Sequence, residues 1–190
     1  MDIPFLVLVL LWFLLLVVMA KVVDMEKDRE KDSAFYRTVM DMTIRALVRV
    51  LRIDIQAQGL EKAPKTGRFL LVCNHLNEAD PAILLKYFRK SQLAFIGKQE
   101  VKNMFLVGPL MHKILCQLIN RENDREALKT IITSIRLIKE DEASVAVFPE
   151  GYIKPDRKLH RFRSGVFKIA LKTKVPIVVC TIQNTKIIFK

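Results

Sequence analysis

The feature that most constrains the fold of this chain is a short apolar run that ends in a polar loop and is followed by a helix start. Residues 70–72 are apolar, as expected for the end of a buried strand. Asp80 and Pro81 are typical of a helix start, because Asp caps a helix and Pro at the first helical position loses no useful donor. We therefore expect a helix over 81–89. His75 then lies in a loop at the carboxyl end of a strand, where open α/β sheets place their ligands.

A loop histidine that precedes an aspartate can form a general-base pair. Neutral imidazole takes a proton from a hydroxyl at modest cost near neutral pH. A carboxylate on the other ring nitrogen fixes the tautomer and stabilises the imidazolium that forms. The same residues also fit a purely structural arrangement, in which Asp80 only caps the helix and His75 only bonds a backbone carbonyl. These residues alone leave both interpretations open.

The charge of the chain favours anionic partners. It carries 32 Lys and Arg against 20 Asp and Glu, a formal net charge of +12 over 190 residues. Anionic lipid, phosphorylated metabolites and nucleic acid all suit such an excess. The length predicts one core domain.

The cysteines and histidines form no recognisable metal or disulfide pattern. The thiols are odd in number, have apolar neighbours and include no C-x-x-C, so we expect free thiols in a reducing compartment: Cys73, Cys116 and Cys180. The histidines lie far apart in the sequence without ligand spacing. We therefore expect no bound metal.

The chain opens with an apolar run over 3–20. At about 1.5 Å per residue the run covers about 27 Å, close to the roughly 30 Å hydrocarbon core of a bilayer. A signal peptide is the alternative, because Val18-Met19-Ala20 resembles a cleavage site, but no basic residue precedes the run. We expect a retained membrane helix over 1–23 that spans the bilayer or lies in one leaflet. The basic residues all follow the run, which predicts that the rest of the chain is cytoplasmic.

Residues 24–58 are expected to form an amphipathic interfacial helix over 33–52 and a lead-in strand over 52–58. Apolar residues repeat every three to four positions on one face: Tyr36, Met40, Ile44, Leu47 and Leu51. Basic residues group on another: Arg37, Arg45, Arg49 and Arg52. Such a helix suits the surface of an anionic membrane, and a core helix with a solvated face fits equally well.

Strands and helices alternate through the rest of the chain. Strands are expected over 93–96, 116–119, 144–148 and 176–182, with a further candidate over 186–189. Helices are expected over 123–140 and from about 164, and a pair of short helices over 101–115. This alternation predicts an α/β domain over 59–190 with a mixed central sheet flanked by helices.

Four sequence blocks stand in one order in this domain: N-H-L-N-E-A-D (74–80), L-I-N-R (118–121), F-P-E-G (148–151) and V-P-I-V (175–178). A weaker block, F-R-S-G-V-F-K, covers 162–168. Together with the apolar run, the blocks resemble the glycerolipid acyltransferase family, most closely the 1-acylglycerol-3-phosphate acyltransferases. The resemblance extends over about 59–185.

The resemblance implies direct transfer of an acyl chain from a thioester to the free hydroxyl of lysophosphatidic acid, which makes phosphatidic acid. His75 would take the hydroxyl proton and Asp80 would orient His75. Arg121 would bind the acceptor phosphate, and Glu150 and Gly151 would shape the pocket. The donor would be acyl-CoA or acyl-acyl carrier protein, with no cofactor. The other expected partner is the phospholipid bilayer.

The chain departs from the family after F-P-E-G. Tyr152 and Ile153 stand where the family usually has Thr-Arg, and Lys154 or Arg157 could supply the missing cation. An acyltransferase that uses another lysolipid or glycerol phosphate is an alternative. A non-catalytic basic adaptor is another, because residues 154–174 are rich in Lys and Arg. The stretch has few aromatics to stack on bases, so we expect no nucleic-acid partner.

Overall fold

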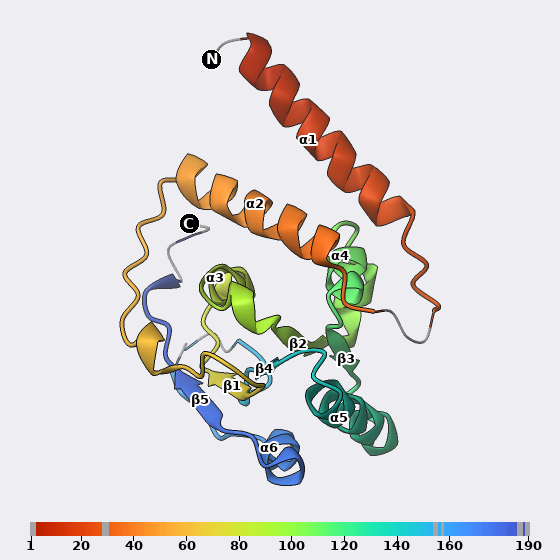
Figure 1. Cartoon of the computed structure of the whole chain (residues 1–190), viewed down its shortest axis with the longest axis vertical. Helices are drawn as coiled ribbons and strands as arrows, with labels where there is room; N and C mark the ends of the chain where they lie inside the picture. Colours follow the sequence, from red (N-terminus) through yellow and green to blue (C-terminus); the bar gives the residue numbers. More distant parts are fainter. Residues whose placement is uncertain (1–2, 28–30, 154–155, 157, 186–187, 189–190) are drawn as a thin grey trace.

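The computed structural model describes the whole chain except residues 1–2, 28–30, 154–155, 157, 186–187 and 189–190 (Figure 1). Five strands form one sheet in the order β3-β2-β4-β1-β5: β1 (Leu70–Cys73), β2 (Ala94–Lys98), β3 (Gln117–Ile119), β4 (Val145–Val147) and β5 (Ile177–Cys180). Every pairing among the described strands is parallel. The predicted α/β class is confirmed. The prediction of a mixed sheet is wrong, because each of these strands is reached by a crossover that returns the chain in the same direction.

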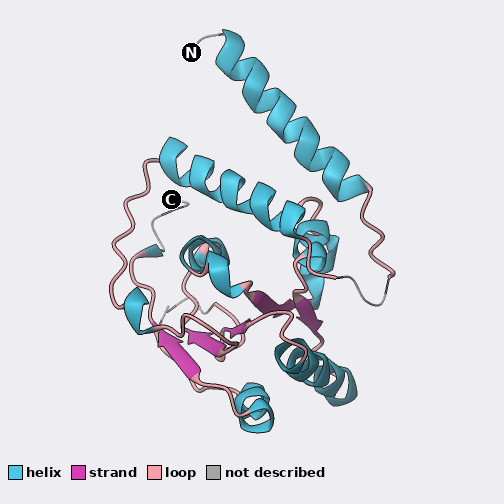
Figure 2. Ribbon diagram, viewed as in Figure 1, coloured by secondary structure: helices cyan, strands magenta, loops and turns pink. Residues whose placement is uncertain are grey.

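Helices cover both faces of the sheet (Figure 2). On one side lie α2 (Ala34–Val50), α3 (Asp80–Tyr87) and α4 (Val107–Lys113). On the other lie α5 (Asp124–Lys139) and α6 (Lys168–Thr173). Both faces are therefore buried, which is why the strands are short apolar runs.

Strand β1 shows how the two faces are filled. Its side chains alternate between faces, so Leu71 packs with Leu84 and Phe88 at the α3 end, while Leu70 packs with Ile131 and Ile169 of the opposite layer. All four residues of β1 are buried. The loop that follows β1 thus leaves from the middle of the core.

The predicted helices over 33–52 and 123–140 are confirmed as α2 and α5. Ser33 caps α2 by accepting the backbone N–H of Tyr36, and Asn123 caps α5 in the same way. Arg37 is not part of a solvated basic face. Its guanidinium pairs with Asp32 at 2.6 Å and donates to backbone carbonyls near β2 and α4. Arg37 therefore belongs to the contacts that hold α2 on the domain, and not to the basic face that was predicted for this helix.

Helix α1 (Ile3–Lys21) occupies the predicted N-terminal segment and extends away from the sheet (Figure 1). Its middle and its last turns contact α2. Trp12 donates to the hydroxyl of Thr43 at 3.1 Å, and the hydroxyl of Tyr36 donates to the carbonyl of Met19 at 3.0 Å. Within the described residues, no helix combines the length and the apolar character needed to cross a bilayer, so the predicted membrane-spanning helix over 1–23 is not supported.

Several predicted details differ. The lead-in strand over 52–58 is irregular, and the predicted pair of helices over 101–115 is a 3-10 helix, η3 (Gln99–Asn103), followed by α4. The chain from 164 begins as a 3-10 helix, η4 (Ser164–Phe167), before α6. The candidate strand over 186–189 lies almost wholly outside the described residues. Two further 3-10 turns complete the order: η1 (Leu60–Lys62) and η2 (Arg89–Ser91).

Candidate active site

The parallel sheet brings the predicted site residues to one edge. The carboxyl ends of parallel strands lie on the same side, and ligands bind there. His75 follows β1, Arg121 follows β3, and Glu150 and Gly151 follow β4. Lys98, the last residue of β2, lies at the same edge and was not identified from the sequence. The sequence blocks, distant along the chain, therefore meet at one edge of the sheet.

His75 and Asp80 are in contact. Nδ1 of His75 lies 2.9 Å from Oδ2 of Asp80. The same oxygen accepts the backbone N–H groups of Leu76 at 2.7 Å and Asn77 at 2.8 Å. The prediction that Asp80 caps the helix is wrong. Ala79 is the N-cap of α3, and the carboxylate of Asp80 turns back to hold the preceding loop.

The surroundings of Asp80 keep it ionised. The side chain is completely buried, and burial alone would raise the pKa of the carboxyl. Hydrogen bonds from His75, Asn77 and Leu76 outweigh that effect and hold the pKa of Asp80 below its usual range. A negative charge therefore lies against Nδ1 of His75. With Nδ1 donating to Asp80, the lone pair of His75 is on Nε2.

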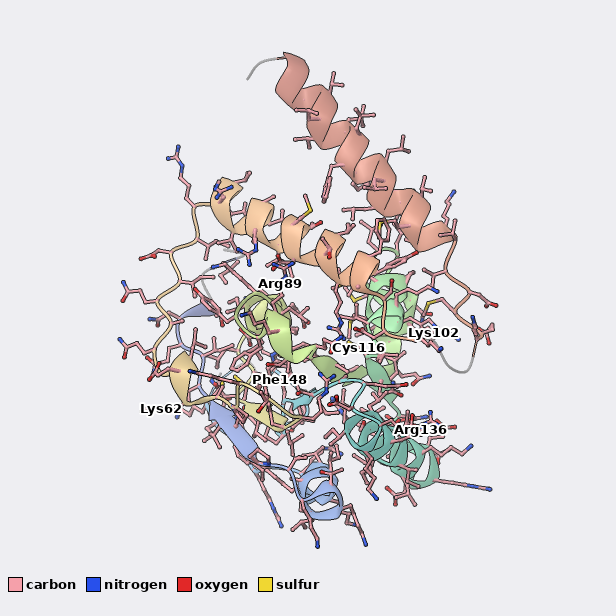
Figure 3. The ribbon with its side chains drawn as sticks, viewed as in Figure 1. Lys62, Arg89, Lys102, Cys116, Arg136 and Phe148 are labelled. Carbon is pink, nitrogen blue, oxygen red and sulfur yellow. The ribbon has the colours of Figure 1, made fainter. Side chains whose placement is uncertain are left out.

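The imidazole is also held across its face. The ring of His75 stacks on Phe148, with centroids 4.1 Å apart and an interplanar angle of 16°. Phe148 lies in the middle of the domain (Figure 3) and packs in turn near Phe95, with centroids 5.9 Å apart. The sequence identified Phe148 only as part of a block. An aromatic residue directly after a buried strand was the signal that could have indicated this contact.

Glu150 connects two loops. It is only 6% exposed. One carboxylate oxygen accepts the backbone N–H of His75 at 3.2 Å, and the other accepts the backbone N–H of His160 at 3.0 Å. Both oxygens are thus engaged by the backbone, so Glu150 positions the His75 loop. The resemblance had suggested that it shapes the acceptor pocket.

Gly151 lies close to the guanidinium groups of Arg163 and Arg121. Its φ of +89° is rarely adopted by other residues. A methyl group placed on its α-carbon would lie 3.1 Å from Nε of Arg163 and 3.7 Å from Cζ of Arg121. The pKa of Arg121 is lowered, first by burial and second by the charge of Arg163, while Glu100 acts in the opposite direction. Arg163 was not predicted as a site residue, and Lys154 lies outside the described residues.

The cysteines are held as neutral thiols. Burial raises the pKa of Cys73, and the neighbouring Cys180 and Asp80 raise it further. Burial also raises the pKa of Cys116 to about 11 and raises that of Cys180. A thiolate is the nucleophilic form of cysteine, so these side chains are poorly suited to carry an acyl group.

The arrangement suits proton removal from a hydroxyl that belongs to an anionic molecule. His75 can supply a base whose tautomer is set by Asp80, and the guanidinium groups near Gly151 supply positive charge at the same edge of the sheet. Among the described residues, no group of three His, Cys, Asp or Glu side chains is arranged to hold a metal ion.

Comparison with known proteins gives consistent results. The Acyltransferase family model matches residues 54–183. A probable 1-acyl-sn-glycerol-3-phosphate acyltransferase of Mycoplasma pneumoniae is 36% identical over 129 residues, which cover 66% of this chain and 47% of that protein. The 1-acyl-sn-glycerol-3-phosphate acyltransferase of Borreliella burgdorferi is 27% identical over 137 residues, 72% of this chain and 54% of that protein. The chain spans about half the length of the curated relatives it matches.

A solved structure shares the fold. The crystal structure of the 1-acyl-sn-glycerophosphate (LPA) acyltransferase PlsC from Thermotoga maritima matches with a TM-score of 0.61 and 22% identity. The match covers 93% of this chain and 68% of that one. The similarity therefore includes the parallel sheet and the helices on its two faces.

Proposed function

Because the chain belongs to the acyltransferase family, we propose that it transfers an acyl chain from an acyl thioester to the free hydroxyl of lysophosphatidic acid, which makes phosphatidic acid. The observation that carries the proposal is the contact between His75 and the buried carboxylate of Asp80, 2.9 Å apart, at the ligand-binding edge of the sheet. Relatives named as 1-acyl-sn-glycerol-3-phosphate acyltransferases support the same reaction.

The reaction proceeds in a single transfer. Nε2 of His75 takes the proton of the acceptor hydroxyl as its oxygen attacks the thioester carbonyl. A carbon–oxygen bond forms, the carbon–sulfur bond breaks, and the imidazolium returns the proton to the leaving thiolate. Asp80 stabilises the imidazolium between these steps. The products are an ester and a free thiol, with no acyl-enzyme and no cofactor.

The acceptor phosphate binds at Arg121. Guanidinium matches phosphate oxygens through two parallel hydrogen bonds. The donor is acyl-CoA or acyl-acyl carrier protein. Another lysolipid or glycerol phosphate is the second candidate acceptor, since each presents a hydroxyl and a phosphate.

The protein works at a membrane, with its catalytic domain on the cytoplasmic side. The acceptor is a lipid, and large apolar side chains are exposed on both N-terminal helices. On α1 they include Leu8 and Leu10, 64% and 66% exposed, and on α2 they include Val50, 66% exposed. We expect α1 and the exposed side of α2 to enter one leaflet.

Extraction with alkaline carbonate tests this attachment, and we expect the protein to stay in the membrane fraction. Release of full-length protein into the supernatant would contradict this attachment.

One assay tests the reaction. Purified protein in detergent is given a labelled acyl thioester and a panel of acceptors: lysophosphatidic acid, lysophosphatidylglycerol, lysophosphatidylcholine and glycerol 3-phosphate. We expect labelled phosphatidic acid as the main product. His75→Ala should abolish it. A protein that binds lipid but transfers no label to any acceptor would be an adaptor instead.

A further inference from the structure

Two guanidinium groups converge beside the His75 loop, over the turn that follows β4. A methyl group added to the α-carbon of Gly151 would lie 3.1 Å from Nε of Arg163 and 3.7 Å from Cζ of Arg121. Nε of Arg163 and Cζ of Arg121 are therefore no farther apart than the sum of these two distances. A phosphate whose oxygens each accept a hydrogen bond of about 2.8 Å can join two guanidinium groups at this spacing.

The backbone fixes the place of Arg163. Its N–H donates to the carbonyl of Pro149 at 2.9 Å. Three residues earlier, the N–H of His160 donates to Glu150 at 3.0 Å, and Glu150 also accepts the N–H of His75. The segment 160–163 is thus attached to the same turn that holds the catalytic loop. Arg163 reaches the site because two backbone hydrogen bonds place it there.

The two positive charges are not neutralised by a close acid. In the described part of the chain, neither guanidinium lies within 4.0 Å of a carboxylate oxygen. Arg121 is partly buried and Arg163 is exposed, so solvent screens their repulsion only in part, and the charge of Arg163 helps to lower the pKa of Arg121 after the larger effect of burial. A bound anion would relieve this repulsion, and an anion with two charges would do so best.

We infer that Arg163 and Arg121 form a two-guanidinium site that selects acceptors with a phosphate monoester over acceptors with a phosphodiester headgroup. This inference rests on the proposed function, and it makes Arg163 a specificity-determining residue. A phosphate monoester carries close to two negative charges near neutral pH, since its second pKa is about 6. A diester carries one charge and lacks one terminal oxygen. Arg163 also supplies the cation that is absent after the F-P-E-G block, where Ile153 stands in place of the Arg that the family usually has.

The test compares Arg163→Gln and Arg163→Lys with Arg161→Gln. Arg161 is an exposed cation two positions away, so its variant matches the loss of charge without touching Gly151. KM and kcat are measured for lysophosphatidic acid and lysophosphatidylglycerol. Arg163→Gln should raise KM for lysophosphatidic acid about 10- to 100-fold, the scale of a lost charge-assisted hydrogen bond. KM for the diester should rise only a few-fold, and kcat should change little.

Arg163→Lys should recover part of the loss, because it keeps the charge without the planar fork. Arg161→Gln should behave as the native protein. The inference is overturned if Arg163→Gln weakens both acceptors equally, or if Arg161→Gln has the same effect, since either result would indicate a general effect of charge. Matched melting temperatures check that the variants are folded.

A binding measurement separates this inference from the proposed function. The dissociation constant for lysophosphatidic acid in detergent is measured without any acyl donor. If the native protein transfers no acyl chain but Arg163→Gln still weakens this binding selectively, the reaction is wrong and the site is right. If the native protein is active and Arg163→Gln binds lysophosphatidic acid unchanged, only the two-guanidinium site is wrong.

Discussion

One carboxylate oxygen of Asp80 serves both the imidazole of His75 and the backbone of the loop that carries it. It lies 2.9 Å from Nδ1 of His75, and two backbone N–H groups of the loop donate to it at 2.7 Å and 2.8 Å. The geometry of the base and the shape of its loop therefore depend on the same atom. Substitutions at Asp80 should separate these two roles by their different effects on kcat and on stability.

Asp80→Asn removes the charge and keeps an oxygen that can accept the loop N–H groups. We expect kcat to fall at least about 10²-fold, the low end for loss of general-base assistance, with a modest loss of stability. Asp80→Ala leaves the buried N–H groups without a partner, at about 1–3 kcal/mol each, and should lower the melting temperature much more. Acyl transfer and thermal unfolding are measured on both variants. Near-native activity of Asp80→Asn would show that Asp80 only stabilises the loop.

The depressed pKa of Asp80 predicts a pH dependence of stability. The stabilisation from the ionised carboxylate is complete above the pKa of an unfolded aspartate, about 3.9, and is lost as pH falls through the lower pKa of the folded state. The native protein should therefore lose its stability advantage over Asp80→Asn below about pH 4. Denaturant unfolding of both proteins in detergent at a series of pH values checks this. A constant difference across that range would contradict the assigned hydrogen bonds.

The sequence predicted that His75 and Asp80 could pair better than it predicted how the pair is held. Short apolar runs predicted the strands, because both faces of a parallel sheet are buried. The spacing of His75 and Asp80 was compatible with a hydrogen-bonded pair. However, an aspartate at this position can either cap the helix or turn its carboxylate back to the preceding loop, and the residue types are the same in both cases. Only the backbone conformation decides between them. The parallel direction of the strands likewise depends on crossovers that no local pattern encodes.

Arg163 shows a different limit of sequence reasoning. Basic residues are frequent over 154–174, so charge alone does not single one out. Its position depends on two hydrogen bonds that the backbone N–H groups of Arg163 and His160 donate to the turn after β4. For the N-terminal helix, composition was informative about apolar character but not about packing. Composition indicated a spanning helix over 3–20, whereas the middle and the last turns of α1 contact α2 through Trp12 and Tyr36.

Glu150→Gln tests the link between the two loops. Both carboxylate oxygens accept backbone N–H groups, and glutamine can accept only one and presents an NH₂ to the other. We expect a loss of about 1–3 kcal/mol in the free energy of unfolding and a fall in kcat, because the N–H of His75 or His160 loses its acceptor. KM for the thioester should change little. A variant with native stability would show that the carboxylate is not needed to hold the loop.

The cysteines should be dispensable for catalysis. Their pKa values are raised by burial, so Cys73, Cys116 and Cys180 are neutral thiols at physiological pH. Replacing all three with Ala should keep most of the activity and cost about 1 kcal/mol of stability per buried site. Activity is measured with the same thioester donor. An acyl-cysteine trapped on the native protein and seen by mass spectrometry would overturn direct transfer.

Phe148→Leu tests whether the aromatic ring positions the base. The imidazole of His75 lies flat on Phe148, with centroids 4.1 Å apart, and leucine fills much of the space without a flat face. We expect kcat to fall about two- to tenfold, which corresponds to the 0.5–1.5 kcal/mol of an aromatic pair. Phe95→Leu is the matched control, because Phe95 stacks near Phe148 and makes no ring contact with His75. It should cost stability and leave kcat nearly unchanged. If the two variants lose kcat equally, the contribution of Phe148 is core packing, and Asp80 alone orients the imidazole.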